Sequence, residues 1–251
     1  MLERFHALID AVDREPHRFP PTLIYREGWM LRLVLDWFQS HRLPDHVITF
    51  QPEASWYSEA LLPTPSRARY QGDSRAEGRT HADGIVGHIA IGSLAKVDAE
   101  LLSDATQFVV TEAKIHSALS RGTSNAPMYD QAARSVACIC EMLSRAERRP
   151  SEVPFLVFIV IAPERRIRRG AITTKLDKRS IEAAVRARVQ SFAPELDGWW
   201  EEWFVPTLEL IKVEAMSWEG LLKDIATVDE PGSHELATFY ERCLKYNAAK
   251  A

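Results

Sequence analysis

Apolar residues recur at helical spacing in two long stretches of the chain, 25–39 and 129–145. In the first stretch the apolar face also carries one acid, Glu27. The apolar residues of that face are Met30, Leu31, Val34, Leu35 and Phe38. The second stretch has an apolar side and a more polar stripe formed by Gln131, Arg134 and Ser135. Both patterns predict amphipathic helices that pack against a core.

Two shorter segments, 108–115 and 155–161, are apolar along most of their length and rich in Val, Ile and Phe. Their length and composition are typical of strands that are buried on both faces. With the predicted helix 129–145 between them, they give the order of a right-handed crossover between parallel strands. We therefore expect an α/β fold in which a mixed central β-sheet is flanked by helices.

The remaining segments carry weaker patterns. These predict strands at 47–51, within 67–86 and at 207–215, and an irregular loop or edge at 54–66. They also predict helices up to about residue 17, at 178–192, from about Ser217 and at 234–246. Because no linker separates these segments, we expect one domain over residues 1–251. Its core would span residues 22–163, and residues 164–251 would form a C-terminal α/β elaboration.

Composition narrows the class of protein further. Of the 251 residues, 46% are hydrophobic and 26% are charged, which is ordinary for a globular protein. A net charge of −4 argues against a surface coated with positive charge, although a local basic cleft is compatible with it. Three cysteines without a C-x-x-C pair favour a reducing cytoplasm. No secretory signal is visible and no apolar run could span a bilayer, so no membrane partner is expected.

Two charged residues, Glu112 and Lys114, interrupt the apolar strand 108–115. They are two positions apart, so both side chains point to the same face of the strand. If the strand that begins near Asp83 is its neighbour, Asp83 and Glu112 can converge. Two converging carboxylates repel each other unless a cation or a proton intervenes, and hard divalent cations such as Mg²⁺ prefer such oxygen ligands.

Lys114 would lie beside this cation. There it could orient a metal-bound water or accept its proton. Partial burial and the nearby cation are expected to lower the pKa of Lys114 toward the range in which a lysine acts as a base.

Asp83 followed by Glu112-Ala113-Lys114, on consecutive core strands and before a helix, resembles the PD-(D/E)XK nuclease superfamily, whose members have the restriction-endonuclease-like fold. The resemblance covers about residues 22–163. It implies that Asp83 and Glu112 bind one or two Mg²⁺ (or Mn²⁺) ions, with the backbone carbonyl of Ala113 as a further ligand. One departure is Ala82, which stands where the family has proline.

Two other residues match acidic and amide positions of the same superfamily. Glu27 lies on the helix before the site strands, and the resemblance implies an auxiliary acid at the metal. Gln131 lies on the helix after Lys114, and the resemblance implies a place at the edge of the site, where it would position the lysine or the substrate.

Arginines near these strands are candidates for contacts to phosphate groups. Arg121, in the loop 120–125, and Arg134, on the following helix, could donate to the phosphates of a scissile strand, or the loop could be plain surface. The basic run 165–169 directly follows strand 155–161 and could line a nucleic-acid groove, or form a solvated turn. The aromatic residues between 199 and 204 are expected to pack in a core or a subunit interface rather than to stack on bases.

Three histidines, His81, His88 and His116, lie near the predicted site in the sequence. Histidines at strand ends and in loops are usually plain polar residues, and a role as metal ligands is the less favoured alternative. Cys138 and Cys140 fall among apolar neighbours in a predicted helix and are expected to be structural.

The sequence thus predicts a Mg²⁺-dependent nuclease that hydrolyses phosphodiester bonds of DNA. One alternative is a non-catalytic module on the same fold that binds nucleic acid or protein. Another is an unrelated α/β enzyme in which these charges form structural ion pairs, which a separation of Asp83 and Glu112 above about 8 Å would favour. The sequence leaves open whether the protein forms a homodimer and which form of nucleic acid it prefers.

Overall fold

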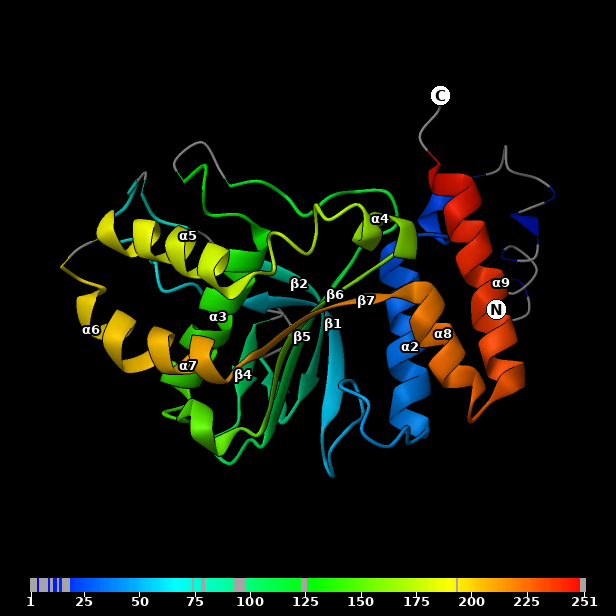
Figure 1. Ribbon diagram of the computed structural model, residues 1–251, viewed down its shortest axis with the longest axis horizontal. Helices are drawn as coiled ribbons and strands as arrows, with labels where there is room; N and C mark the ends of the chain where they lie inside the picture. Colours follow the sequence, from blue (N-terminus) through cyan, green and yellow to red (C-terminus); the bar gives the residue numbers. More distant parts are fainter. Residues whose placement is uncertain are drawn as a thin grey trace.

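A mixed β-sheet of five strands runs through the middle of the molecule (Figure 1). The computed structural model describes residues 4, 9, 11, 12, 14, 19–73, 75–77, 80–92, 98–122, 126–192 and 194–248. In order across the sheet, the strands are β1 (Ser55–Leu62), β2 (Thr80–Gly87), β5 (Gln107–Ala113), β6 (Phe155–Ala162) and β7 (Lys212–Ser217). β2 is antiparallel to β1 and β5, whereas β5, β6 and β7 are parallel. The predicted α/β fold with a mixed central sheet is confirmed.

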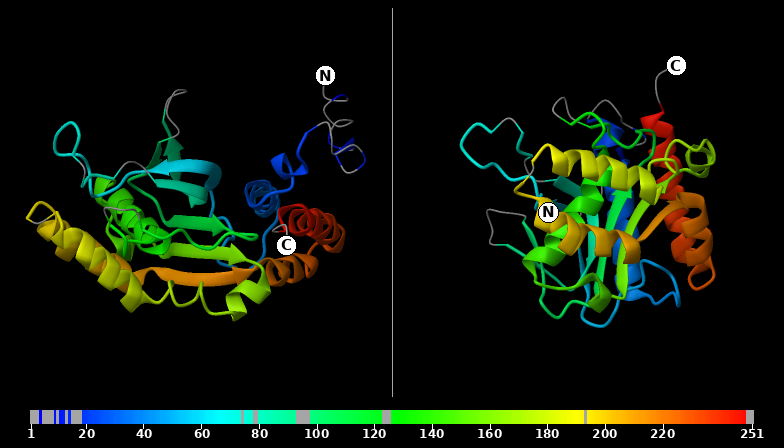
Figure 2. Two further views of the ribbon diagram at one scale, coloured as in Figure 1. Left: turned by 90° about the horizontal axis from the view of Figure 1, so that it is seen from above. Right: turned by 60° about the vertical axis from the view of Figure 1, so that its left-hand side comes forward.

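Helices cover both faces of this sheet (Figures 1 and 2). One face is covered by α3 (Gln131–Arg145), α5 (Lys178–Gln190), α6 (Asp197–Trp199) and α7 (Val205–Leu210). The other is covered by α2 (Glu27–Ser40), α8 (Trp218–Ala226) and α9 (Glu230–Asn247). The short helix α4 (Glu164–Arg168) follows β6. The smaller elements are the helical turns Pro21–Leu23, Pro150–Glu152 and Trp200–Phe204 and a two-stranded sheet of β3 (Ile89–Ile91) and β4 (Ala99–Leu101).

The helix α3 is the predicted crossover between the parallel strands β5 and β6. Asp130 caps its start, because the carboxylate accepts hydrogen bonds from the backbone N–H groups of Ala132 and Ala133 at 3.0 and 3.2 Å. Its apolar residues are buried against the sheet, among them Val136, Ile139 and Leu143. Cys138 and Cys140 are also buried here, which agrees with the expected structural role.

The central strand β5 is buried along its whole length. Phe108 and Val110 pack in the core under α3, whereas Val109 and Ala113 pack in the core under α2. Because side chains alternate along a strand, Glu112 points to the α3 face. The fold therefore places this carboxylate inside the molecule rather than on a solvated surface.

The close packing of α2 on the sheet depends on Gly84 in β2. A Cβ atom at this position would lie 2.6 Å from the Thr111 hydroxyl oxygen and 3.0 Å from side-chain carbons of Leu31 and Leu35. Since real Cβ atoms do not approach so closely, only glycine fits here without a shift of its neighbours. Gly84 directly follows Asp83, so the same packing fixes the strand that carries the first predicted site residue.

The C-terminal part of the chain is built into the same sheet. β7 extends the sheet in parallel beside β6, and α8 and α9 share one hydrophobic core with α2. Ser217 caps α8 as predicted, since its side chain accepts a hydrogen bond from the Gly220 N–H at 2.9 Å. Trp218 is fully buried, and its indole N–H donates to the carbonyl oxygen of Lys114 at 3.0 Å. The C-terminal helices therefore contact the backbone of a predicted site residue.

Several weakly patterned segments differ from their predictions. Residues 47–51 contain no strand, and neither do the described residues between 67 and 79. The segment 54–66 contains the edge strand β1, and 207–215 divides into the end of α7 and the start of β7. The N-terminal helix predicted up to about residue 17 lies outside the described residues, apart from positions 4, 9, 11, 12 and 14.

The side chain of Gln107 explains the missing strand at 47–51. Its amide oxygen accepts a hydrogen bond from Gln51 N–H, and its amide nitrogen donates to the Thr49 carbonyl, both at 2.8 Å. These bonds satisfy backbone groups that a neighbouring strand would otherwise pair. Ile48 and Phe50 are nevertheless buried, so the apolar pattern here reports burial and not strand pairing.

No helix in the described part of the chain is both long and apolar enough to cross a membrane. The aromatic segment after residue 198 packs inward, as expected. The rings of Trp200 and Phe204 stack with centroids 4.6 Å apart, and both residues belong to the core under α3.

Candidate active site

Three predicted charged side chains meet where β2 and β5 lie side by side. Gly84 pairs with Thr111, so Asp83 lies across from Glu112 in the antiparallel register. The Lys114 ammonium nitrogen is 3.3 Å from Asp83 Oδ2 and 3.3 Å from Glu112 Oε2. These two oxygens can be no farther apart than twice that distance, which is below the limit of about 8 Å for sharing one ion. The predicted convergence of Asp83, Glu112 and Lys114 is therefore found.

The cluster is buried on one side and open on the other. Glu112 is completely buried and Lys114 is 7% exposed, whereas the Asp83 side chain keeps 25% of its surface accessible. A ligand would therefore reach the cluster past Asp83. Charges so deeply buried cost free energy unless they are paired, and each of the three has an opposite charge within contact.

The backbone of Ala113 holds Asp83 in place. The Ala113 N–H donates a hydrogen bond to Asp83 Oδ2 at 2.8 Å. The Ala113 side chain points to the opposite face of the sheet, into the core under α2. This bond brings the Asp83 carboxylate to the backbone of Ala113, the residue whose carbonyl is the predicted third metal ligand.

Two side chains of α3 fix the orientation of Glu112. Gln131 donates from Nε2 to Glu112 Oε2 at 2.5 Å, and its Oε1 accepts from the Ser120 N–H at 3.0 Å. The Ser135 hydroxyl donates to Glu112 Oε1 at 3.3 Å. Gln131 thus lies at the edge of the site as predicted, although it contacts Glu112 and not Lys114.

The contact of Ser135 with the site was not predicted from the sequence. The signal was present, because Ser135 follows Gln131 by one helical turn on the polar stripe of α3. A buried hydroxyl on the sheet-facing side of a helix needs a partner, and Glu112 is that partner.

Burial and charge repulsion shift the pKa of Glu112. Burial is the larger cause and the neighbouring Asp83 carboxylate adds to it, so the pKa of Glu112 rises to about 8 despite the opposing effect of Lys114. A carboxyl group that retains its proton near neutral pH is the expected result of placing two carboxylates together without a divalent cation.

Without a divalent cation, the pKa of Lys114 is raised. Burial disfavours its ammonium form, but the carboxylates of Glu112 and Asp83 outweigh burial and raise the pKa of Lys114 above its ordinary value. In the absence of a metal ion the lysine is thus a firmly held cation. The lowered pKa of Lys114 was expected beside a bound divalent cation, and for that state it stays a prediction.

Glu27 is half-buried in the first turn of α2. It lies near Cys243 of α9, where burial first and the Glu27 charge second raise the pKa of the thiol to about 12. Among the described residues, no hydrogen bond or ion pair joins Glu27 to Asp83, Glu112 or Lys114. In the same part of the chain, no group of three or more acids, histidines or cysteines is arranged to hold a metal ion. The predicted auxiliary role of Glu27 has no contact in this structure to support it.

The two predicted phosphate-binding arginines are Arg134, near the start of α3, and Arg121, in the loop that follows β5. Arg134 donates to the Ser120 hydroxyl at 2.8 Å, and its Nε is buried without a hydrogen-bond partner. Arg121 is exposed on the loop that follows β5. Ser120 therefore connects Arg134 with Gln131, and through Gln131 with Glu112.

The three histidines do not join the cluster. His81 is exposed, His88 contacts the Pro52 carbonyl at 2.9 Å, and His116 contacts the Leu244 carbonyl at 3.3 Å. Their contacts agree with the expected roles as polar residues of strand ends and loops.

The chain was compared with protein-family models, with curated proteins and with solved structures, and none of the three comparisons finds a match.

The donor set suits a hard divalent cation. Mg²⁺ is commonly bound through one or two carboxylates, with water and substrate oxygen atoms completing its coordination. Asp83 and Glu112 supply two such carboxylates, and Asp83 faces solvent from which water and substrate could enter. The ammonium of Lys114 contacts both acids, and the pKa of Glu112 is nevertheless raised, first by burial and second by the charge of Asp83.

Proposed function

We propose that this protein is a metal-dependent nuclease that hydrolyses phosphodiester bonds of DNA. The observation that carries the proposal is the contact of Lys114 with both Asp83 and Glu112, which come from neighbouring strands. Two carboxylates at one partly open position can hold a divalent cation, and an adjacent lysine can stabilise negative charge on a reacting phosphate.

Each residue of the cluster has a role in the proposal. Asp83, Glu112 and the Ala113 carbonyl would hold Mg²⁺ or Mn²⁺, which supplies an activated water and offsets negative charge on the phosphate. Gln131 keeps Glu112 in position through the bond at 2.5 Å, with Ser135 as a second support.

Lys114 is the group that acts on the reacting atoms. Its ammonium is held by two carboxylates, so it is charged and oriented before substrate binds. From this position it would donate a hydrogen bond to the attacking water or to a phosphate oxygen on which negative charge develops. Arg121 and Arg134 would contact the phosphates that flank the scissile bond, and Glu27 would be an auxiliary acid.

A cleavage assay tests the proposal. Purified protein is incubated with duplex DNA, single-stranded DNA and RNA in Mg²⁺, in Mn²⁺ and in EDTA. We expect cleavage of DNA with either ion and none in EDTA. Lys114→Met should reduce the rate at least about 100-fold while the protein stays folded by circular dichroism, because the substitution removes a group that acts in the transition state.

Lys223→Met is the matched control, since Lys223 is an exposed lysine on α8, away from the cluster. Its rate should equal that of the wild type. Absence of cleavage of every substrate with both ions, or equal rates for Lys114→Met and wild type, would show that the proposal is wrong.

A second candidate is a non-catalytic nucleic-acid-binding module on the same fold, in which the charged cluster has a structural role only. Lys114 already contacts both carboxylates, and such an internal ion-pair cluster can hold the strands together without a metal ion. The same experiment separates the two functions. DNA binding that is indifferent to EDTA and is accompanied by no cleavage would support the module.

A further inference from the structure

The helix α4 lies next to the candidate active site although it belongs to the C-terminal part of the chain. Ile161 of β6 pairs with Ala113 of β5, and its carbonyl accepts a hydrogen bond from the Lys114 N–H at 2.8 Å. The chain then passes through Pro163 and enters α4 at Glu164. α4 therefore starts at the end of the strand adjacent to the one that leads into Lys114.

A cleft of about 540 Å³ opens between α4 and the segment that follows Lys114. His116 lines one side of this cleft, and Arg165 and Arg168 line another. The remaining wall is formed by Pro163 and Glu164 at the start of α4, by Glu219 of α8, by Leu244 of α9 and by Ala248, which follows α9. His116 follows Lys114 by two residues, so the cleft lies beside the segment of chain that leads away from the candidate site.

Among the described residues, three of the four arginines between positions 165 and 169 have no acidic partner. Arg168 pairs with Glu164 at 2.5 Å. For Arg165, Arg166 and Arg169, the residues that the structure describes provide no ion pair, and the Nε atom of Arg166 is buried without a hydrogen-bond partner. On α5, by contrast, Arg186 pairs with Glu182 at 2.9 Å.

The acids in the wall are already engaged. Glu219 accepts a hydrogen bond from the Glu164 N–H and another from the Tyr240 hydroxyl, both at 2.9 Å. Glu164 pairs with Arg168. These contacts join α4, α8 and α9 and leave Arg165 and Arg169 as exposed positive charges.

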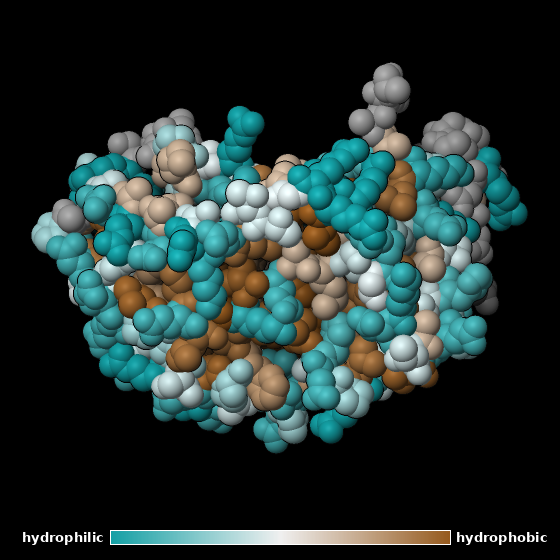
Figure 3. Space-filling view, viewed as in Figure 1, coloured by the Kyte–Doolittle hydropathy of each residue, from teal (hydrophilic) through white to brown (hydrophobic). Residues whose placement is uncertain are grey.

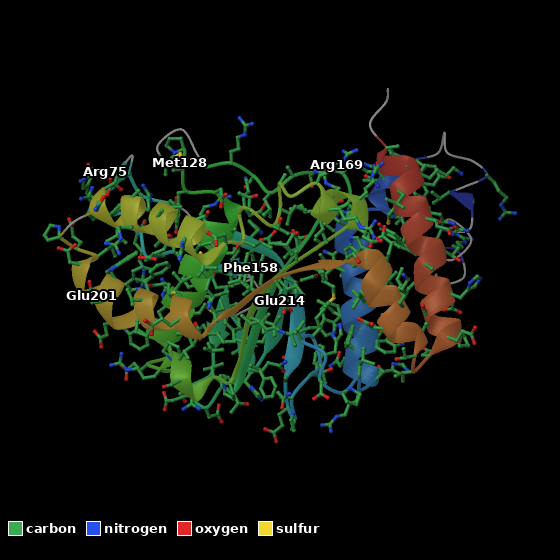
Figure 4. The ribbon with its side chains drawn as sticks, viewed as in Figure 1. Arg75, Met128, Phe158, Arg169, Glu201 and Glu214 are labelled. Carbon is green, nitrogen blue, oxygen red and sulfur yellow. The ribbon has the colours of Figure 1, made fainter. Side chains whose placement is uncertain are left out.

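The positive charge is local, because the whole chain has a net charge of −4. Figure 3 shows a strongly hydrophilic patch over α4, and Figure 4 places Arg169 at the same rim of the molecule. Such a concentration of unpaired guanidinium groups on an otherwise acidic protein attracts polyanions to this rim.

We propose that this cleft and the α4 arginines bind the phosphate backbone of the nucleic-acid strand that is cut at Asp83 and Glu112. This inference rests on the proposed function and names the substrate class further, as a polynucleotide that extends past His116 onto α4. Guanidinium groups donate paired hydrogen bonds to phosphate oxygens, and such contacts position a strand without selecting its sequence.

The test compares two double variants that remove the same charge. Arg165→Gln/Arg169→Gln alters the rim of the cleft, and Arg179→Gln/Arg186→Gln alters two exposed arginines of α5. Binding of fluorescein-labelled single-stranded DNA, duplex DNA and RNA, each about 30 nucleotides long, is measured by anisotropy in EDTA over a range of KCl concentrations.

The α4 variant should bind its preferred polynucleotide at least about tenfold more weakly than the wild type at about 100 mM KCl. Its salt slope, which is the slope of the logarithm of the binding constant against the logarithm of the KCl concentration, should fall in magnitude by about 1.5 to 2, as expected for two lost phosphate contacts. The α5 variant should bind within about twofold of the wild type. Equal affinities and salt slopes for the two variants would overturn the inference. A wild type that binds polyglutamate but no nucleic acid would also overturn it.

Failure of this inference is distinguishable from failure of the proposed function. If the wild type cleaves DNA and the α4 variant cleaves with an unchanged KM, the nuclease proposal holds and the cleft is not its substrate path. If no protein cleaves but the α4 variant loses nucleic-acid binding, the cleft is a nucleic-acid site and the nuclease proposal is wrong.

Discussion

At the scale of single residues, Lys114 connects the two acids of the candidate site. Its ammonium is 3.3 Å from each of two carboxylates, one of which is completely buried. Removing one partner of a buried ion pair typically costs about 3–5 kcal/mol, because the remaining charge stays in a medium of low polarity. The metal-free protein thus depends on Lys114 for stability, and the proposed reaction uses the same group.

Glu112 is expected to contribute little or nothing to stability in the absence of metal. In Glu112→Gln the amide keeps a hydrogen-bond acceptor for Gln131 and removes repulsion with Asp83. In EDTA its unfolding free energy should be equal to or above that of the wild type, within about 1 kcal/mol, as measured by urea unfolding.

Glu182→Gln, an exposed substitution on α5, controls for the change of one charge. Added Mg²⁺ should stabilise the wild type and the control more than Glu112→Gln, because a ligand stabilises only the state that binds it. A loss of several kcal/mol for Glu112→Gln in EDTA would instead identify Glu112 as part of a structural ion-pair cluster.

His46 gives a pH dependence that is independent of the candidate site. Burial lowers the pKa of His46 below its ordinary 6.5, and Lys212 acts in the same direction, whereas Asp224 and Glu214 oppose it. The native state therefore binds fewer protons than the unfolded state as pH falls below about 6.5, and stability must fall with it.

The variant His46→Asn should remove this pH dependence. The asparagine oxygen can accept the hydrogen bond that the His46 ring nitrogen accepts from the Ile48 N–H at 3.3 Å. Urea unfolding at about pH 7.5 and about pH 5.5, on either side of the ordinary histidine pKa, should show a larger loss for the wild type than for the variant. The same loss in both proteins would mean that other groups cause it.

The charged residues of the candidate site could be picked out from residue types, whereas their contacts could be predicted only in part. Glu112 and Lys114 stand out because charged residues interrupt an apolar strand, and strand alternation puts them on one face. To predict the hydrogen bond from Ser135 to Glu112, one must know how α3 is rotated about its axis relative to β5. The sequence alone does not give this rotation. The raised pKa of Lys114 depends on its distances to two carboxylates, and these distances cannot be read from the sequence.

At the scale of elements, Gly84 determines how closely α2 approaches the sheet. In Gly84→Ala the new methyl group would overlap Thr111, Leu31 and Leu35. Overpacking of this kind costs about 1–3 kcal/mol, so we expect a loss in that range by urea unfolding. Because Asp83 is the preceding residue, cleavage should also become slower.

Gly198→Ala is the matched control for this substitution. Gly198 lies in α6, where a Cβ atom would have no other atom within 4 Å, so alanine should be neutral or slightly stabilising. Equal stabilities of Gly84→Ala and Gly198→Ala would show that α2 is not packed tightly at this point.

Strongly patterned elements were predictable and weakly patterned ones were not. β5, β6 and α3 are buried by tertiary packing on the sides that their apolar residues indicate, so pattern and structure agree. The edge strand β1 is only partly buried and carries less signal. At residues 47–51 the Gln107 side chain replaces strand pairing, which no local pattern could indicate.

At the scale of the whole molecule, two groups of helices meet at the candidate site. α3 on one face supplies Gln131 and Ser135, which hold Glu112. α8 on the other face supplies Trp218, which holds the Lys114 backbone, while α4 adds the arginines of the cleft. The C-terminal residues predicted as an elaboration therefore contact the same site as the core.

The proposed mechanism depends most on the binding of a divalent ion by Asp83 and Glu112. Calorimetric titration of Mn²⁺ into the wild type, Glu112→Gln and Glu182→Gln measures this binding. We expect one or two bound ions in the wild type and in Glu182→Gln, and at least about tenfold weaker binding in Glu112→Gln. Equal Mn²⁺ binding by wild type and Glu112→Gln, or no binding by the wild type, would contradict the mechanism.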